Sequence, residues 1–128
     1  MKLILLLALT FSLAGCSSIT PEDYSATSPQ LDLRTFLDGK LKAYGMLQDR
    51  AGRMTRRFTA DMEASWEGEK GTLTEYFLFD DGEQQKRVWH LEHDGNGHYT
   101  GTADDVSGVA LGTVSGAVFN RQYKLDVP

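Results

Sequence analysis

The sequence predicts an all-β fold, an antiparallel meander that forms a lipocalin-like barrel or a partly open barrel, with a short N-terminal helical segment. Two observations lead to this prediction. Runs of alternating apolar and polar residues follow one another along the second part of the chain, and turns containing glycine separate them at intervals of about 8 to 14 residues. Short connections join the runs, and this favours an up-and-down barrel over a Greek-key sandwich.

A lipoprotein signal peptide is predicted for residues 1–15. A positive start and an apolar stretch lead to the small residues Ala14 and Gly15, and Cys16, the only cysteine, follows them. The apolar stretch is too short to cross a bilayer as a permanent helix. We expect the chain to be cut before Cys16, whose thiol would carry the lipid that anchors the protein to a membrane. The alternative is an ordinary secretory signal in which Cys16 plays no part.

The residues after Cys16 predict where the protein resides. Ser17 and Ser18 stand where an aspartate would retain a lipoprotein at the inner membrane of a Gram-negative cell, so we expect the periplasmic face of the outer membrane. Acylation of Cys16 would leave no thiol for a disulfide, a nucleophile or a metal site. The net charge of −5 argues against a nucleic-acid partner, so the predicted attachment to the membrane depends on the lipid and not on charge.

The rest of the chain is predicted to hold a tether and one domain. Residues 16–30 comprise the lipidated cysteine and a flexible tether rich in Ser, Thr, Pro, Glu and Asp. Residues 31–128 are long enough for a single β domain with one core. At the start of this domain, four apolar residues between Leu31 and Leu37 recur at roughly helical spacing. They predict a short helical segment that packs on the core and ends at Gly39.

The clearest predicted strand spans residues 54–66. Its even-numbered residues are mostly apolar and include Phe58, Met62 and Trp66, whereas its odd-numbered residues are polar. This period of two places one face in the core and the other in water. Turn signals separate the strands, and the strongest lies at residues 94–97. The other predicted strands span residues 40–49, 72–79, 84–92, 98–103, 106–114 and 119–127.

The predicted binding site is an apolar pocket inside the barrel. A pocket that is mostly apolar suits a small apolar or amphipathic ligand, and we expect a lipid or a fatty acid. Two other hypotheses stay open: a structural or interaction lipoprotein of the cell envelope with a filled core and no ligand, and a cofactor-free enzyme acting on lipids. The predicted lining consists of inward-facing residues of three strands, namely Phe58, Met62, Trp66, Phe77, Trp89 and Leu91.

Arg56 and Arg87 fall in the inward-facing rows of their strands. An arginine in a barrel interior is costly unless it meets a carboxylate, a carbonyl or an anionic ligand. The functional hypothesis is that one of them receives the carboxylate of a fatty acid. The structural alternative is an arginine at the barrel mouth that stacks on an aromatic ring or pairs with an acidic residue. The candidate partners in that alternative are Trp66, Trp89, Asp80, Asp81 and Asp104.

No metal, cofactor or catalytic group is expected. His90, His93 and His98 lie around one hairpin, but an odd spacing along a strand points side chains to opposite faces, so metal-ligand geometry is not predicted. The adjacent pair Asp104 and Asp105 alternates faces in the same way, which argues against a general acid and base. The serine-glycine pairs lack the flanking glycines of a nucleophile elbow. An enzymatic activity is therefore not favoured.

Short segments spread along the chain resemble a known family. They are Leu31-Asp32-Leu33, Phe36-Leu37-Asp38-Gly39-Lys40, Gln48-Asp49-Arg50-Ala51-Gly52, Arg56-Arg57-Phe58, Asp80-Asp81-Gly82-Glu83, Arg87-Val88-Trp89, Tyr99-Thr100-Gly101-Thr102-Ala103-Asp104-Asp105-Val106, and Gly112 onward. In this order and spacing they resemble the bacterial lipoprotein family of unknown function 3833, over essentially all of the mature chain.

This resemblance implies a lipoprotein with no assigned reaction. Some family members are encoded beside proteins similar to cyclopropane-fatty-acid synthases and chalcone isomerases, which implies a connection to lipid chemistry. Family members commonly continue past the equivalent of Pro128 with further strands that contain an Asp-Asp-Trp segment. This chain is therefore expected to be a shortened member of the family.

Overall fold

The computed structural model describes residues 18–127 and contains one seven-stranded antiparallel sheet. The strands follow one another in the order of the sequence, so the predicted meander is confirmed. Each strand begins and ends within two residues of its predicted bounds. The strands are β1 (Gly39–Gln48), β2 (Met54–Glu67), β3 (Lys70–Phe79), β4 (Gln84–His93), β5 (His98–Thr102), β6 (Val106–Ser115) and β7 (Val118–Leu125).

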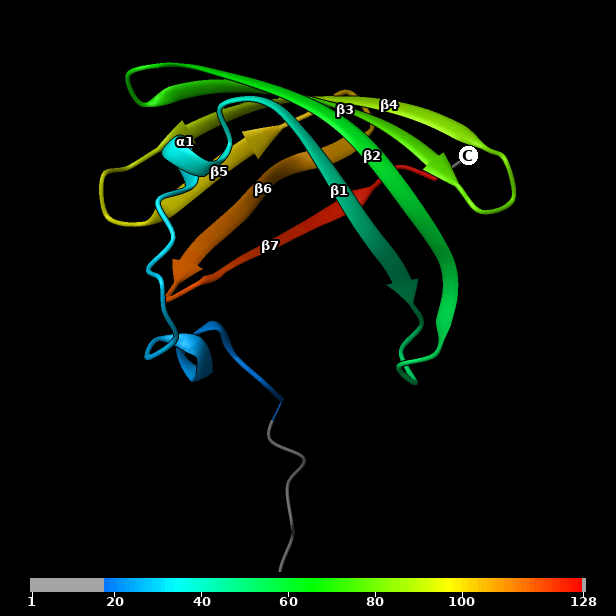
Figure 1. Ribbon diagram of the computed structural model, residues 1–128, viewed down its shortest axis with the longest axis horizontal. Coiled ribbons are helices and arrows are strands. Elements are labelled where there is room, and N and C mark those ends of the chain that lie inside the picture. The colour runs from blue at the N-terminus through cyan, green and yellow to red at the C-terminus, as the bar shows by residue number, and fades with distance from the viewer. Residues whose placement is uncertain (1–17, 128) are drawn as a thin grey trace, which may run out of the picture.

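The sheet curls into a half-barrel that stays open between its first and last strands. Within the described residues β1 pairs with β2 and β7 pairs with β6, so each has one free edge. Figure 1 shows the sheet as an arch with its concave side facing downward in that view. Of the two predicted forms of the barrel, the partly open one is observed.

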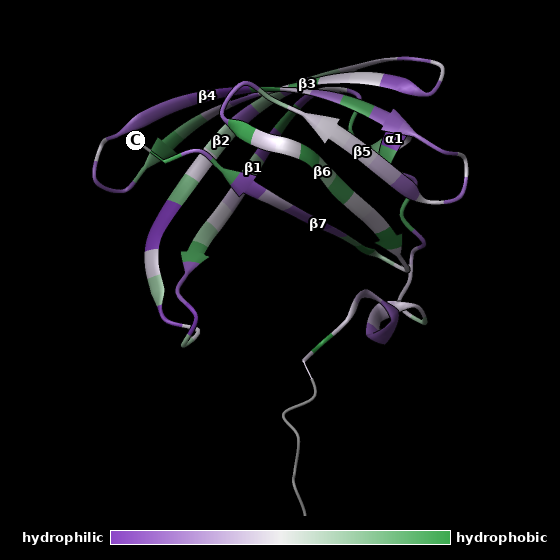
Figure 2. Ribbon diagram, turned by 180° about the vertical axis from the view of Figure 1, so that it is seen from behind, coloured by the Kyte–Doolittle hydropathy of each residue, from purple (hydrophilic) through white to green (hydrophobic). Residues whose placement is uncertain are grey.

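The two faces of the sheet follow from the alternation of residues along its strands. In β2, Ala60 and Ala64 are buried on the concave side, while Asp61 and Glu63 on the other face are exposed. Figure 2 shows the same alternation of hydrophobic and hydrophilic residues along several strands. The core therefore lies on the concave side. Its buried members are Leu33, Leu37, Ala64, Leu73, Trp89, Tyr99, Val106 and Ala110.

The predicted helical segment is a single turn, α1 (Leu33–Phe36), that covers one end of the arch. Asp32 caps this turn, because its carboxylate accepts hydrogen bonds from the backbone N–H and the hydroxyl of Thr35. Leu33 and Leu37 are buried against the sheet. The Nε1 of Trp66 on β2 donates to the carbonyl of Leu37 at 2.7 Å, and this bond ties the helical turn to the sheet.

Residues 18–30, assigned above to the tether, contain one short 3-10 helix, η1 (Pro21–Tyr24). This segment meets the turn between β6 and β7, where Ala117 N donates to the hydroxyl of Thr27 at 2.9 Å and Leu31 N donates to Gly116 O at 2.8 Å. The predicted signal peptide and Cys16 lie outside the described residues. Within residues 18–127, both helices are far shorter than a membrane-spanning helix would need to be.

Within residues 18–127, the core is built from residues that follow the 3-10 helix η1. Every buried member of the hydrophobic core lies between Leu33 and Ala110, and the partly buried residues that pack on it lie between Leu31 and Tyr123. A water-soluble form that starts at Ser17 therefore retains all of these core residues.

Candidate functional site

The concave side of the sheet holds a cavity of about 320 Å³. Its walls are mainly apolar and come from five of the predicted site residues: Phe58 and Met62 on β2, Phe77 on β3, and Trp89 and Leu91 on β4. Residues of α1 and its flanks close one end, and residues of β5, β6 and β7 form the opposite wall. The arch thus surrounds a space of the size and chemistry of a small-ligand site.

Small residues at inward-facing positions keep this space open. The cavity is lined by Ala43, Ala60 and Ala110, together with Gly101 and Gly112. At Gly112, a Cβ atom would lie 2.5 Å from the nearest ring atom of Phe119, so the ring lies against the bare backbone. Aromatic rings packed over glycine cover the sheet instead of projecting into the interior, and the middle of the arch remains empty.

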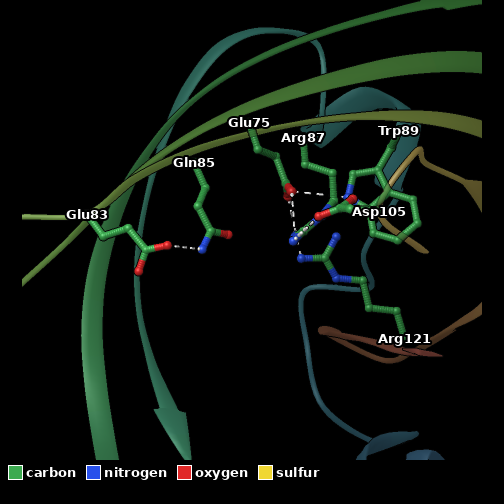
Figure 3. A network of polar contacts seen from close by, with 7 residues as sticks. All are labelled: Glu75, Glu83, Gln85, Arg87, Trp89, Asp105 and Arg121. Carbon is green, nitrogen blue, oxygen red and sulfur yellow. Dashed lines mark hydrogen bonds and ion pairs between the residues drawn. The ribbon is translucent and has the colours of Figure 1, made fainter. Parts of the chain in front are cut away.

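A cluster of charged groups lies on the cavity wall and is drawn in Figure 3. Its centre is Glu75 on β3, which is only 2% exposed. The Glu75 carboxylate accepts a hydrogen bond from Trp89 Nε1 at 3.1 Å. It also lies 3.8 Å from Arg87 Nη1 and 3.5 Å from Arg121 Nη2. A carboxylate at this depth requires such partners, because burying an unpaired charge is expensive.

Arg87 on β4 is held by two carboxylates. Its Nε and Nη2 donate to the two oxygens of Asp105 at 2.9 to 3.1 Å, while its Nη1 faces Glu75. Burial lowers the pKa of Arg87, but the hydrogen bonds and the charge of Asp105 outweigh burial and leave it above its ordinary value. The hydrogen bonds from Arg87 also lower the pKa of Asp105. Arg87 therefore stays charged although it is only 7% exposed.

Arg121 on β7 differs from Arg87, because it lines the cavity and remains partly accessible. Its side chain is 38% exposed, and its guanidinium lies 5.7 Å from the ring centre of Trp89 and 5.8 Å from that of Tyr123. Within residues 18–127 the one hydrogen bond of its guanidinium is the 3.5 Å contact with Glu75. Most of its N–H donors are thus free to meet another group.

Arg56 lies near the start of β2, outside the cavity lining. Its Nη2 lies 2.9 Å from Asp81 and 2.6 Å from Glu83, and its guanidinium covers the ring of Phe79 at 3.7 Å. The hydrogen bond to Asp81 raises the pKa of Arg56. Pairing with Asp81 corresponds to the structural alternative considered from the sequence, whereas the stacking ring is Phe79 and neither Trp66 nor Trp89.

The remaining predicted site residues lie as follows. Trp66 is adjacent to the cavity but not part of its lining, and its ring meets Tyr99 edge-to-face at 6.1 Å. Arg87 likewise is not part of the lining, and the aspartate that it pairs with is Asp105 and not the neighbouring Asp104. The two adjacent aspartates lie in the turn between β5 and β6 and not within a strand, so the alternation expected from their spacing does not apply to them.

His93 is held by packing and hydrogen bonds within the fold. His93 stacks on Tyr99 at 4.3 Å, its Nδ1 lies 2.8 Å from Glu69 and its Nε2 accepts from Gly97 N at 3.2 Å. Of the described residues, no group of three or more His, Cys, Asp or Glu side chains is arranged to hold a metal ion.

Glu75 and Arg121 are the two charged residues of the cavity lining, and sequence reasoning did not single them out. The signal was present for both. Glu75 lies between Leu73 and Phe77 in an alternating row, and Arg121 follows Phe119 in the same way. The test that identified Arg56 and Arg87 as inward-facing would have identified these residues too.

Comparison with known proteins gives a family for this chain. Residues 10–128 match the family described as protein of unknown function (DUF3833). The chain belongs to this family. No curated protein and no solved structure gives a significant match. Membership in DUF3833 agrees with the family resemblance seen in the sequence.

Proposed function

We propose that this protein binds one small apolar or amphipathic ligand, a fatty acid or another lipid with a single acyl chain, in the concave cavity. The observation that carries the proposal is a space of about 320 Å³ whose apolar wall is interrupted by two charged residues, Glu75 and Arg121. Ligand sites usually measure about 300 to 1,000 Å³ and combine apolar walls with a few polar groups. A volume at the lower end of that range favours one acyl chain over two.

The proposal includes a location. An apolar segment followed by Ala14, Gly15 and Cys16 supports a lipoprotein anchored through the Cys16 thiol. Ser17 and Ser18 support the periplasmic face of the outer membrane. A domain attached there would lie beside the bilayer from which an acyl chain would come.

Mass spectrometry of the purified protein tests the proposal. The full chain is purified from a membrane, and non-covalent lipid is extracted without hydrolysis, so that acyl chains bonded to Cys16 stay on the protein. We expect single-chain lipid in the extract at close to one molecule per protein. Ala60→Phe, which places a ring on the cavity wall, should remove most of it, whereas Asp61→Phe on the opposite face should not.

A second candidate is a structural or interaction lipoprotein without a ligand. The free edge of β1 favours it, because Tyr44, Met46 and Leu47 are exposed on a strand that has a neighbour on one side only in the described part of the chain. Such an edge can accept a strand from a partner protein. Extracts without lipid from both the parent protein and the Ala60→Phe variant would favour this candidate and contradict lipid binding.

A further inference from the structure

We propose that Arg121 binds the ligand head group, so that the site selects a fatty-acid carboxylate over an uncharged lipid with the same chain. This inference rests on the proposed function, because it concerns a ligand held in the same cavity. It assigns the head group to an arginine on β7 that differs from the two arginines suggested by the sequence.

The guanidinium of Arg121 has hydrogen-bond donors available for a ligand. A guanidinium carries five N–H donors. Within residues 18–127, Arg121 uses one of them, in a 3.5 Å contact with Glu75 that lies at the long limit for a hydrogen bond. The side chain lines the cavity and is 38% exposed, so water or a ligand can reach it. Its planar arrangement of donors matches the two oxygens of a carboxylate.

The other two candidate arginines are occupied. Arg87 donates from Nε and Nη2 to Asp105 and faces Glu75 with Nη1, and it is not part of the cavity lining. Arg56, near the start of β2, is paired with the carboxylates of Asp81 and Glu83. A ligand carboxylate would have to displace an existing ion pair at either position.

The buried carboxylate of Glu75 has partners other than Arg121. When Arg121 turns toward a ligand, Glu75 keeps the hydrogen bond from Trp89 Nε1 at 3.1 Å and the charge of Arg87 at 3.8 Å. Arg121 would also keep its position over the rings of Trp89 and Tyr123. Binding therefore exchanges one long ion pair, at 3.5 Å from Glu75, for a pair with the ligand carboxylate, and it leaves no buried carboxylate unpaired.

Matched ligands and matched variants test this assignment. The water-soluble form that starts at Ser17 is titrated with dodecanoic acid and with dodecanol, and binding is followed through tryptophan emission, because Trp89 lies on the cavity wall. Arg121→Gln should weaken binding of the acid about 10- to 100-fold and change binding of the alcohol less than about 3-fold. Arg121→Lys should restore part of the preference for the acid.

Lys124→Gln is the control, because it removes the same charge from β7 at a position of opposite parity to Arg121. It should leave the binding of both ligands unchanged. Equal weakening of acid and alcohol by Arg121→Gln, or no weakening of either, would overturn the role of Arg121 while lipid binding itself stands. If the parent protein binds neither ligand, the proposed function fails and this inference fails with it.

Discussion

Arg87 shows how one residue can be both buried and charged in this fold. It faces the concave side beside the rings of Phe77, Trp89 and Tyr123, at 5.4 to 6.0 Å from their centres. Desolvation of a guanidinium would be costly there if Asp105 did not supply two hydrogen-bond acceptors. The network of Glu75, Arg87, Asp105 and Arg121 has no net charge, so this wall of the cavity is polar without being strongly charged.

At the residue scale, we predict that Asp105→Asn lowers the free energy of unfolding by about 1.5 to 3 kcal/mol at pH 7, the usual value for hydrogen bonds to a charged group. Arg87 lowers the pKa of Asp105, so its stabilising effect is complete above the unfolded-state pKa of about 3.9 and disappears as the pH falls through the lower folded-state pKa. The difference between parent and variant should therefore shrink below about pH 4. Urea unfolding at a series of pH values measures it.

Asp104→Asn is the matched control for this prediction. Asp104 is exposed and adjacent in sequence, and its substitution should change stability by less than about 0.5 kcal/mol at any pH. Equal effects of the two substitutions, or a difference for Asp105→Asn that persists in acid, would show that the ion pair with Arg87 does not stabilise the fold.

The sequence revealed part of this network. Alternation alone placed Arg56 and Arg87 on inward-facing rows, and the structure confirms that Arg87 is buried. The identity of its partner depends on strand register: β4 pairs with β5 so that His90 lies opposite Thr102, and the same register extended into the turn after β5 brings Asp105 opposite Arg87. Glu75 and Arg121 could have been found by the same alternation, because each lies two residues from an apolar member of its row.

At the scale of elements, the period of two explains why the strands were predictable within two residues. Each strand is bounded by a turn with its own local chemistry, such as Asp94, whose carboxylate accepts from the backbone N–H of Asn96 and of His98. Local alternation and turn residues do not depend on the rest of the fold. The register of β6 and β7 shifts between Ser107 and Leu111. In the sequence, the only sign of this irregularity is a glycine in an otherwise regular strand.

The orientation of β2 leads to a prediction about its two faces. Trp66→Ala should lower the free energy of unfolding by about 3 to 5 kcal/mol, because it removes a large packed ring and leaves the carbonyl of Leu37 without its donor. Glu63→Ala, on the exposed face, should change it by less than about 0.5 kcal/mol. Urea melts of the soluble form measure both, and comparable losses would contradict the division of β2 into one buried and one exposed face.

At the scale of the whole molecule, the curvature of the sheet was the property least predictable from the sequence. Seven strands were expected to form a closed or a partly open barrel, and local patterns could not decide between them. Closure depends on the stagger accumulated across the sheet and on whether the first and last strands meet. The cavity is a consequence of this curvature together with the small residues on the inner wall, so its lining was predicted in part and its charged residues were not.

The proposed attachment to the membrane gives a prediction for the full chain. Cys16→Ser should abolish incorporation of an alkyne-labelled fatty acid and prevent processing before residue 16, because the thiol that accepts the lipid is gone. Folding of the domain should continue, since the core residues lie between Leu33 and Ala110. Labelled protein is detected in a gel after coupling to a fluorophore. Incorporation that persists in the variant would rule out lipidation at this position.

The central claim is that an acyl chain occupies the cavity, and quenching of Trp89 by a brominated fatty acid tests it most directly. The chain has two tryptophans, so Trp66→Phe leaves Trp89 as the single emitter on the cavity wall. Bromine quenches indole emission only at contact. We predict saturable quenching with one fatty acid per protein, reversed by the unbrominated acid. A variant that remains folded by circular dichroism and shows no quenching at any soluble concentration would contradict the claim.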